Sequence, residues 1–392
     1  MSQAAAIPTE GRFFAIALST FYAAVFAING GYMPFFPVWL QSVGLEPSVI
    51  GLVMAAPTAA RLIAVPVVTA WVAKHDVLRG AIIATAIATF TGVLALGSVR
   101  SAFAIALLLW LTSLAWTPLI PLTDAYALRG VAHYRRSYGP IRLWGSVGYI
   151  GGALVAGLFT HWLGAIHAIW IIAALALVCA LSSFRLTPPG QAKGGTLQVA
   201  KPSALLRNSA FASVLIAAAL IQGSHSAYYT FSAISWRAAG MDTLTIALLW
   251  ALCVVVEIVL FALSPRLRLS PAGLIALGGA GAVLRWIVMA QEPPLAVLAC
   301  AQALHALSFG ATHLGTMGLF ARVVPGRMMP NAQGYTATAG GIVMASAGIA
   351  CGALFASLGQ GIYYGMATMA MAGTLVMLLA RGAIRAAMRA EA

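Results

Sequence analysis

The chain has 392 residues, of which 61% are hydrophobic and 8% are charged, and its formal net charge is +14 at pH 7. A water-soluble protein of this length needs many more polar groups to cover its surface. The composition therefore excludes a soluble globular fold, and the excess positive charge has to be explained by its position along the chain before nucleic-acid binding is considered.

Apolar segments recur along the whole chain. A helix that spans a bilayer needs about 20 mostly apolar residues, and the pattern predicts twelve of them. The first residues lack the pattern of a cleaved secretory signal, so we expect the first helix to stay in the mature protein. The predicted spans are 13–41, 48–73, 79–98, 101–127, 141–162, 165–184, 211–236, 244–264, 271–290, 294–322, 333–358 and 361–382.

The basic residues predict the orientation of these helices. If the N-terminus is cytoplasmic, most of the 22 basic residues fall in cytoplasmic loops and tails. Arg100 and Arg237 then lie outside, and Arg61 and Arg285 lie within spans. The positive-inside rule therefore predicts cytoplasmic N- and C-termini in a multi-pass protein of a bacterial inner membrane.

A change of composition near the middle divides the chain into two halves. Residues 185–210 are rich in Pro, Gly and Lys, which is typical of a linker. The triplet at 44–46 (GLE) returns in similar form at 240–242 (GMD), and the same offset matches Arg61 to Glu257. We therefore predict an all-α membrane protein with two pseudo-symmetric six-helix bundles, at 1–184 and 211–392, as in rocking-bundle transporters.

Ionisable side chains inside the predicted spans are the candidate functional residues, because each costs about 2.5–3.5 kcal/mol at the bilayer centre. Asp124 and Glu257 are the two acidic residues that fall within spans. A hairpin of the fourth and fifth helices would pair Asp124 with Arg142, and Arg285 on the ninth helix is the expected partner of Glu257. A purely structural role for these pairs is the alternative.

Histidines and tyrosines accompany these charges. His225 and His305 titrate near pH 6.5 unless perturbed, and histidine with carboxylate inside a membrane is typical of a proton relay. Tyr149, Tyr228 and Tyr229 either stack on a flat substrate or fill helix interfaces.

No motif for catalysis or nucleotide binding is present. The sequence lacks a phosphate-binding loop, zinc-ligand spacing, a nucleophile elbow and a dinucleotide fingerprint. We therefore expect no enzymatic activity, no catalytic residues, no metal and no cofactor, with a proton gradient as the driving force.

Several stretches resemble a known family. PLIPLTDAYA, YGPIRLWGSVGY, IQGSHSAYYTFSAISWRAAG, VLRWIVM and QALHALSFGATHL resemble, in that order, segments of the 3-phenylpropionate permease family of the major facilitator superfamily. GGYMPFFPVWL resembles the more distant lactose permease family of oligosaccharide and nucleoside symporters. The resemblance implies the major facilitator fold and proton-coupled transport.

The lactose permease pattern also implies roles for individual residues. Its acid and arginine on the fourth and fifth helices, which bind sugar, match Asp124 and Arg142, and its stacking residue matches Tyr149. Its charged pair on the eighth and ninth helices matches Glu257 and Arg285, and its tenth-helix histidine matches His305. The chain departs from the pattern at Gln302, where the family has a basic residue, and at Ser308, where it has the proton-carrying carboxylate.

Taken together, these observations predict proton-coupled uptake of a small aromatic carboxylate such as 3-phenylpropionate by alternating access. The expected partners are an organic anion, protons and the lipid bilayer, without nucleic acid, and the chain is expected to be a monomer. Alternatives are symport of a neutral sugar or nucleoside, efflux by proton antiport, and a membrane sensor that transports nothing. The predicted substrate-binding residues are Asp124, Arg142, Tyr149, Tyr228, Tyr229 and Arg285, and the predicted proton-coupling residues are Glu257, His305, His225 and Asp124.

Overall fold

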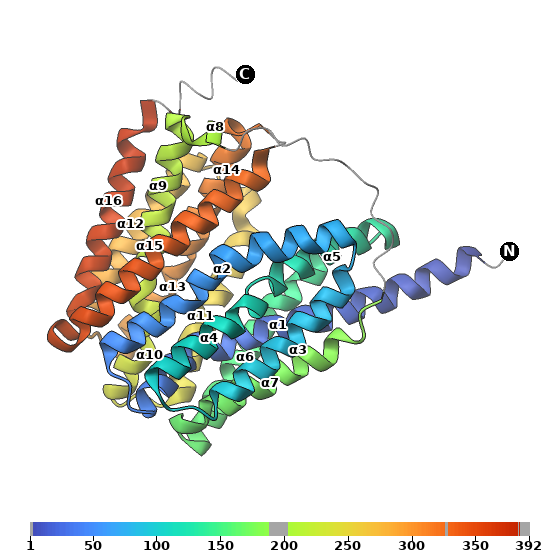
Figure 1. The fold of residues 1–392 in the computed structure, drawn as a ribbon. Helices are drawn as coiled ribbons and strands as arrows, with labels where there is room; N and C mark the ends of the chain where they lie inside the picture. Colours follow the sequence, from blue (N-terminus) through green and yellow to red (C-terminus); the bar gives the residue numbers. More distant parts are fainter. Residues whose placement is uncertain (1–2, 188–202, 326–327, 383, 385–392) are drawn as a thin grey trace. The chain divides into compact units, whose positions relative to one another are not determined.

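The computed structural model describes residues 3–187, 203–325, 328–382 and 384, and every regular element in these residues is a helix (Figure 1). Most of the predicted linker, residues 188–202, and the tail from residue 385 lie outside the described residues.

The first half of the chain supplies the first six predicted spans. The fourth span consists of two helices, α4 and α5, which meet at Pro118; proline lacks the N–H that would continue a helical ladder. The elements are α1 (Gln3–Ser42), α2 (Pro47–His75), α3 (Leu78–Leu96), α4 (Ala102–Trp116), α5 (Leu119–Tyr134), α6 (Tyr138–Leu163), a short 3₁₀ turn (Ala165–His167) and α7 (Ala168–Ser183).

The second half supplies the other six spans. Its seventh and tenth spans are also interrupted, the seventh at Ser224–His225 and the tenth by a π-helical turn (Ala306–Ala311). The helices are α8 (Ser203–Leu206), α9 (Ser209–Gly223), α10 (Ser226–Ala238), α11 (Thr243–Leu263), α12 (Pro271–Met289), α13 (Leu295–Ala303), α14 (Thr312–Val323), α15 (Met329–Leu358) and α16 (Ile362–Leu379).

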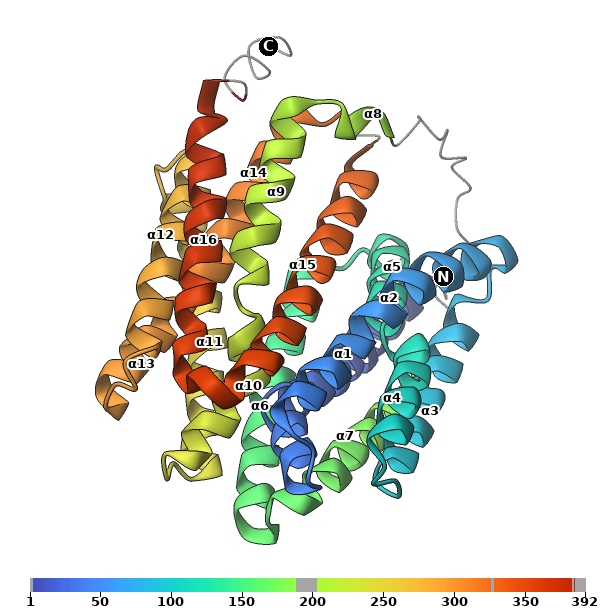
Figure 2. The same ribbon diagram turned by 60° about the vertical axis from the view of Figure 1, so that its left-hand side comes forward.

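The predicted number of crossings is confirmed. Eleven runs of described residues are long and apolar enough to span a membrane. The last run, Asn331–Leu379, has 49 residues and would be about 70 Å long as a straight helix, more than twice the thickness of the hydrocarbon core. It instead contains α15 and α16, between which Gly359 has a φ of 51° and the chain reverses direction (Figure 2). Twelve crossings result.

The contacts divide the chain into two compact units. Unit 1 comprises Met1–Gly194 and Trp236–Ala251, and unit 2 comprises Gly195–Ser235 and Leu252–Ala392. In unit 1 the loops predicted to be cytoplasmic share contacts: Arg129 Nη1 lies 2.6 Å from Asp76 Oδ1, and Arg79 Nε donates to the Leu186 carbonyl at 2.5 Å. The domain limits 1–184 and 211–392, and the cytoplasmic termini, stay predictions.

A side-chain cap fixes the start of α11, the helix that carries Glu257. Asp242 Oδ2 accepts the Thr245 hydroxyl at 2.6 Å, and Oδ1 accepts the backbone N–H groups of Leu244 and Thr245. These hydrogen bonds, the Thr245 hydroxyl first among them, hold the pKa of Asp242 below its usual value. The carboxylate thus satisfies N–H groups that the first turn leaves unpaired.

Glycines allow α1 and α6 to pack closely in unit 1. A Cβ added to Gly148 would collide with the carbonyl of Ala23, and one added to Gly152 would collide with the carbonyl of Ala27. A Cβ at Gly151 would meet no atom within 4 Å. Close approach of backbones is the usual role of small residues in membrane helices, and here it fixes the spacing between side chains on α1 and on α6.

We predict that Gly152→Ala separates α1 from α6 and lowers stability by about 1–3 kcal/mol, as overpacking does. Gly151→Ala is the matched control and should leave stability unchanged. Thermal unfolding of both variants in the same detergent tests this. Equal melting temperatures for Gly152→Ala and Gly151→Ala would contradict the packing role.

Candidate functional site

A carboxylate cluster lies in unit 1, where α1, α5 and α6 meet. The hydroxyls of Tyr22 and Tyr138 donate to Asp124 Oδ1 at 2.6 and 3.0 Å. Arg142 Nε lies 3.7 Å from the same oxygen. The predicted pairing of Asp124 with Arg142 is present in the structure, and two tyrosine hydroxyls donate to the same carboxylate oxygen.

Helical spacing builds this cluster. Tyr138 and Arg142 are four residues apart on α6, so they share one face. Tyr22 and Phe26 are four residues apart on α1 and also share a face. Asp124 follows shortly after the Pro118 break that begins α5. Three short segments therefore bring their polar and aromatic groups to one place.

Arg142 keeps free hydrogen-bond donors. Its guanidinium lies 4.3 Å from the ring centre of Phe26 and 5.4 Å from that of Tyr22. Among the described residues, its two terminal nitrogens have no hydrogen-bond partner. The side chains of Arg142 and Asp124 are 32% and 35% exposed. A planar guanidinium with two free nitrogens is suited to binding a carboxylate at two points.

A second cluster lies in unit 2 around Arg285, which is fully buried. Its Nη1 donates to His305 Nδ1 at 2.9 Å, and its Nη2 donates to Gln302 Oε1 at 2.8 Å. Longer contacts join it to the Ser308 hydroxyl at 3.4 Å and to Cys253 Sγ at 3.7 Å. These acceptors carry no formal charge, so neutral dipoles solvate the cation in place of water.

Hydrogen bonding fixes the tautomer of His305. Because Nδ1 accepts from Arg285, the ring carries its proton on Nε2 when neutral. That nitrogen lies 3.7 Å from Glu257 Oε2. His305 therefore contacts both Arg285 and Glu257, and protonation of His305 at Nδ1 requires that Arg285 moves away. The expected direct pairing of Glu257 with Arg285 stays a prediction.

His225 extends the unit 2 cluster. Its Nδ1 lies 3.1 Å from the Gln222 carbonyl, which can only accept, so Nδ1 is the donor. Its Nε2 lies 3.1 Å from the Ser308 hydroxyl, which also contacts Arg285. Polar contacts thus run without a gap from His225 through Ser308, Arg285 and His305 to Glu257.

The breaks in two helices position these histidines. α9 ends at Gly223 and α10 begins at Ser226, and His225 lies between them. His305 immediately precedes the π-helical turn that separates α13 from α14. A π turn inserts an extra residue into a helix and is frequent at functional sites. It shifts the register of the tenth span so that His305 and Ser308 both face Arg285.

The tyrosines predicted to stack on a substrate differ in their surroundings. Tyr228 is buried, and its ring centre lies 4.4 Å from the Arg285 guanidinium. The half-buried Tyr229 stacks on His225 with ring centres 5.8 Å apart. Tyr149 is half-buried on α6, two turns beyond Arg142 on the same side of the helix.

Several contacts of the site were not predicted. Tyr22 and Tyr138 bind Asp124, and Cys253 accepts from Arg285. Spacing could have identified two of them, because Tyr138 lies one turn before Arg142 and Cys253 lies one turn before Glu257.

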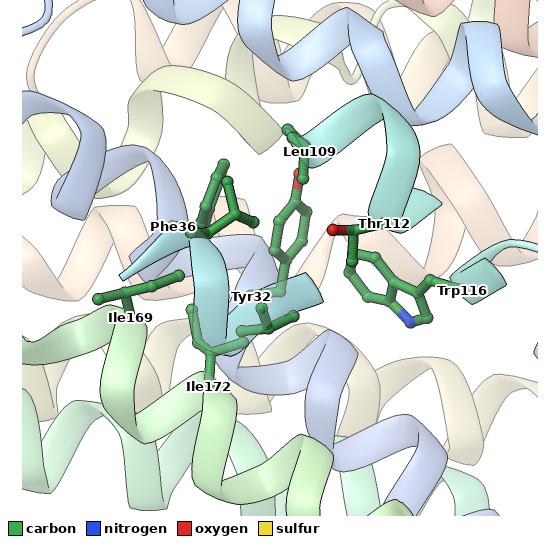
Figure 3. A pocket seen from close by; sticks show the side chains of 9 residues that line it. Tyr32, Phe36, Leu109, Thr112, Trp116, Ile169 and Ile172 are labelled. Atoms are coloured by element: carbon green, nitrogen blue, oxygen red, sulfur yellow. The ribbon is translucent and has the colours of Figure 1, made fainter. Parts of the chain in front are cut away.

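A separate cavity in unit 1 is lined by apolar groups and does not include any of these charges. It lies between α1, α3, α4 and α7 and has a volume of about 10 Å³, which is room for about one water molecule and far less than the roughly 300 Å³ of small ligand pockets. The ring of Tyr32 lies between those of Phe36 and Trp116 in it, with ring centres 4.7 Å from each (Figure 3). We regard it as a packing defect beside the site.

Comparison with known proteins gives consistent relatives. The model of the "MFS_1 like family" matches residues 15–368. The "Probable 3-phenylpropionic acid transporter" of Escherichia coli is 32% identical over 359 residues, which cover 89% of this chain and 93% of that protein. The "Maltose permease" of Geobacillus stearothermophilus is 26% identical over 332 residues, which cover 82% of this chain and 83% of that protein.

A solved structure shares the fold. The crystal structure of the nucleoside transporter NupG superposes with a TM-score of 0.79 over 95% of this chain and 98% of that chain, at 16% sequence identity. At this identity the likeness concerns the fold alone.

We predict that Gln302→Leu destabilises the protein by about 2 kcal/mol, because it removes a neutral acceptor from a buried cation. Gln333→Leu is the control, since Gln333 is exposed. Thermal unfolding in detergent is the measurement. A melting temperature of Gln302→Leu equal to that of Gln333→Leu would show that Arg285 does not depend on this contact.

Proposed function

We propose a substrate and a driving force for this chain, which belongs to the MFS_1 like family of the major facilitator superfamily and is therefore a membrane transporter and not an enzyme. The chain takes up a small aromatic carboxylate such as 3-phenylpropionate together with a proton. The observation that carries this proposal is the free guanidinium fork of Arg142 between aromatic rings.

Arg142 binds the carboxylate of the substrate in this proposal, and Arg285 does not. The terminal nitrogens of Arg142 are without partners among the described residues, whereas those of Arg285 already donate to His305 and Gln302. The Arg142 side chain is 32% exposed, and Arg285 is fully buried. Phe26 and Tyr22 beside Arg142 offer apolar and stacking surface to an aromatic ring. The similarity to the transporter named for 3-phenylpropionic acid supports the same substrate class.

Glu257 with His305 carries the proton. Glu257 is 19% exposed, and its Oε2 lies 3.7 Å from the Nε2–H of His305. Arg285 occupies the other ring nitrogen and so keeps His305 neutral. A proton that binds Glu257 neutralises its carboxylate. When Arg285 then moves away from His305, the Nδ1 atom of His305 becomes the next proton acceptor. His225 and Ser308 continue the relay. Asp124, held by two tyrosine hydroxyls and by Arg142, is the second candidate.

A neutral sugar is the alternative substrate, and one observation favours it. The chain is similar to a maltose permease, and an acid–arginine pair can bind hydroxyl groups through hydrogen bonds alone. The two terminal nitrogens of Arg142, which have no hydrogen-bond partner among the described residues, favour an anion instead. Competition by unlabelled maltose against labelled 3-phenylpropionate distinguishes the two substrates.

The proposal is tested by uptake of radiolabelled 3-phenylpropionate into proteoliposomes, with and without an inward proton gradient. Wild-type protein should accumulate the anion when the gradient is present. Arg142→Gln should lose uptake at least tenfold, because the carboxylate loses its two-point contact, which is worth about 1.5–3 kcal/mol. Glu257→Gln should lose gradient-driven accumulation but retain exchange of labelled for unlabelled substrate, because exchange needs no net proton transfer.

Arg100→Gln is the matched control for Arg142→Gln, since Arg100 lies between α3 and α4 and contacts backbone carbonyls of that loop. Full uptake by Arg142→Gln would show that Arg142 does not bind the carboxylate of the substrate. Proton-coupled accumulation by Glu257→Gln would show that Glu257 does not carry the transported proton. If wild-type protein takes up no 3-phenylpropionate but takes up a labelled sugar, and maltose inhibits that sugar uptake, the substrate is a sugar and not an anion.

A further inference from the structure

Besides Arg142 and Arg285, a third arginine lies within a span, on α2, and the proposed mechanism does not use it. Arg61 is the central residue of α2 (Pro47–His75), with fourteen residues on either side of it. Its side chain is exposed, and no described residue forms a hydrogen bond or ion pair with it. An arginine at this depth is costly unless it faces the interior of a bundle or a water-filled cavity.

Helical geometry places Arg61 on the side of α2 that faces α1. The Tyr32 hydroxyl of α1 donates to Met54 Sδ of α2 at 3.7 Å. Arg61 follows Met54 by seven residues, which is two turns, so it lies on the same face about 10 Å further along α2. Buried residues Ile50 and Val72 share this sector. Arg61 therefore lies on the same side of α2 as the buried residues Ile50 and Val72, but its own side chain is exposed.

The same geometry gives the level of Arg61 relative to the Asp124 cluster. α1 and α2 are consecutive and antiparallel, joined by residues 43–46. The residue seven positions before Tyr32 on α1, Val25, therefore lies at the level of Arg61. Tyr22 and Phe26 are within one turn of that level. These two rings contact Arg142, and Tyr22 also binds Asp124. Arg61 and Arg142 thus lie at the same depth in unit 1.

The internal repeat supports a role for this position. The offset that relates the triplets at 44–46 and 240–242 matches Arg61 to Glu257. Glu257 contacts the tenth span through His305 in unit 2. The equivalent helices of unit 1 are α2 and the α4–α5 pair, and α5 carries Asp124. The repeat therefore relates Arg61 to the ionisable cluster of its own unit.

We propose that Arg61 is the second cation of the substrate site and balances the charge of the bound carboxylate, so that Asp124 stays ionised throughout transport. This inference rests on the proposed function. Asp124 and Arg142 alone sum to zero, and a monoanion would leave the site with a net negative charge. With Arg61 the empty site carries +1, and the loaded site is neutral. The anion then binds without protonation of Asp124, and the transported proton is left to Glu257.

The charged and titratable groups that face Asp124 are few. Tyr22 on α1 and Tyr138 and Arg142 on α6 contact its carboxylate, and Arg61 on α2 is the group that this proposal adds to them. On α5 itself, Arg129 pairs with Asp76. α4 contributes no ionisable group, α3 contributes Arg79, which binds the Leu186 carbonyl, and α7 contributes the buried Cys179. Removal of Arg61 therefore leaves Asp124 as the group whose protonation can restore neutrality.

The test is equilibrium binding of 3-phenylpropionate to detergent-solubilised protein between pH 5.5 and pH 8, without any gradient. Arg61→Gln should weaken binding at least tenfold at pH 8, and its affinity should recover as the pH falls, because protonated Asp124 then restores the charge balance. Arg61→Lys should bind like wild type. Adding Asp124→Asn to Arg61→Gln should restore affinity at pH 8 and remove the pH dependence.

The outcomes separate this inference from the proposed function. If wild-type protein binds 3-phenylpropionate and Arg61→Gln binds it with the same affinity at pH 8, the proposed role of Arg61 is wrong and the proposed function stands. A loss in Arg61→Gln that neither low pH nor Asp124→Asn reverses would also overturn it, since the loss would then come from damaged structure. Absence of binding by wild type would overturn the proposed substrate and this inference with it.

Discussion

A charged side chain inside a membrane persists only where the protein replaces the water that it has lost, and the two units meet this requirement in different ways. In unit 2, Arg285 is fully buried and neutral acceptors surround it. In unit 1, Asp124 and Arg142 keep about a third of their side-chain surface exposed, and Arg142 keeps free donors. The terminal nitrogens of Arg285 already have partners, so this arginine is suited to controlling a histidine, whereas Arg142 is suited to binding an anion.

Interrupted helices make both arrangements possible. A continuous helix satisfies its own backbone and presents side chains at fixed intervals of three or four residues, and a break adds backbone groups and side-chain directions that this spacing does not allow. The fourth span breaks at Pro118 shortly before Asp124, the seventh breaks at His225, and the tenth contains a π turn directly after His305. Discontinuous helices of this kind form the binding sites of many transporters. Each break lies beside an ionisable group that the proposed mechanism uses.

The sequence predicted the fold well because the bilayer imposes one length and one polarity on every crossing. It also predicted the pairing of Asp124 with Arg142, since a single hairpin joins their helices. It did not predict that Arg285 donates to His305, because that contact depends on the π turn, which has no local sequence signature. Cys253 resembled a packing residue, and only its neighbours in space reveal its contact with Arg285.

The central claim is that one proton and one monoanion cross the membrane together, the anion on the arginines of unit 1 and the proton on Glu257. Such a cycle moves no net charge. The direct measurement is 3-phenylpropionate accumulation in proteoliposomes under a potassium diffusion potential of 100 mV, with equal pH on both sides. Each net charge moved would gain about 2.3 kcal/mol, or roughly fiftyfold accumulation. The account predicts accumulation with a pH gradient and none with the potential alone. Accumulation driven by the potential would contradict it.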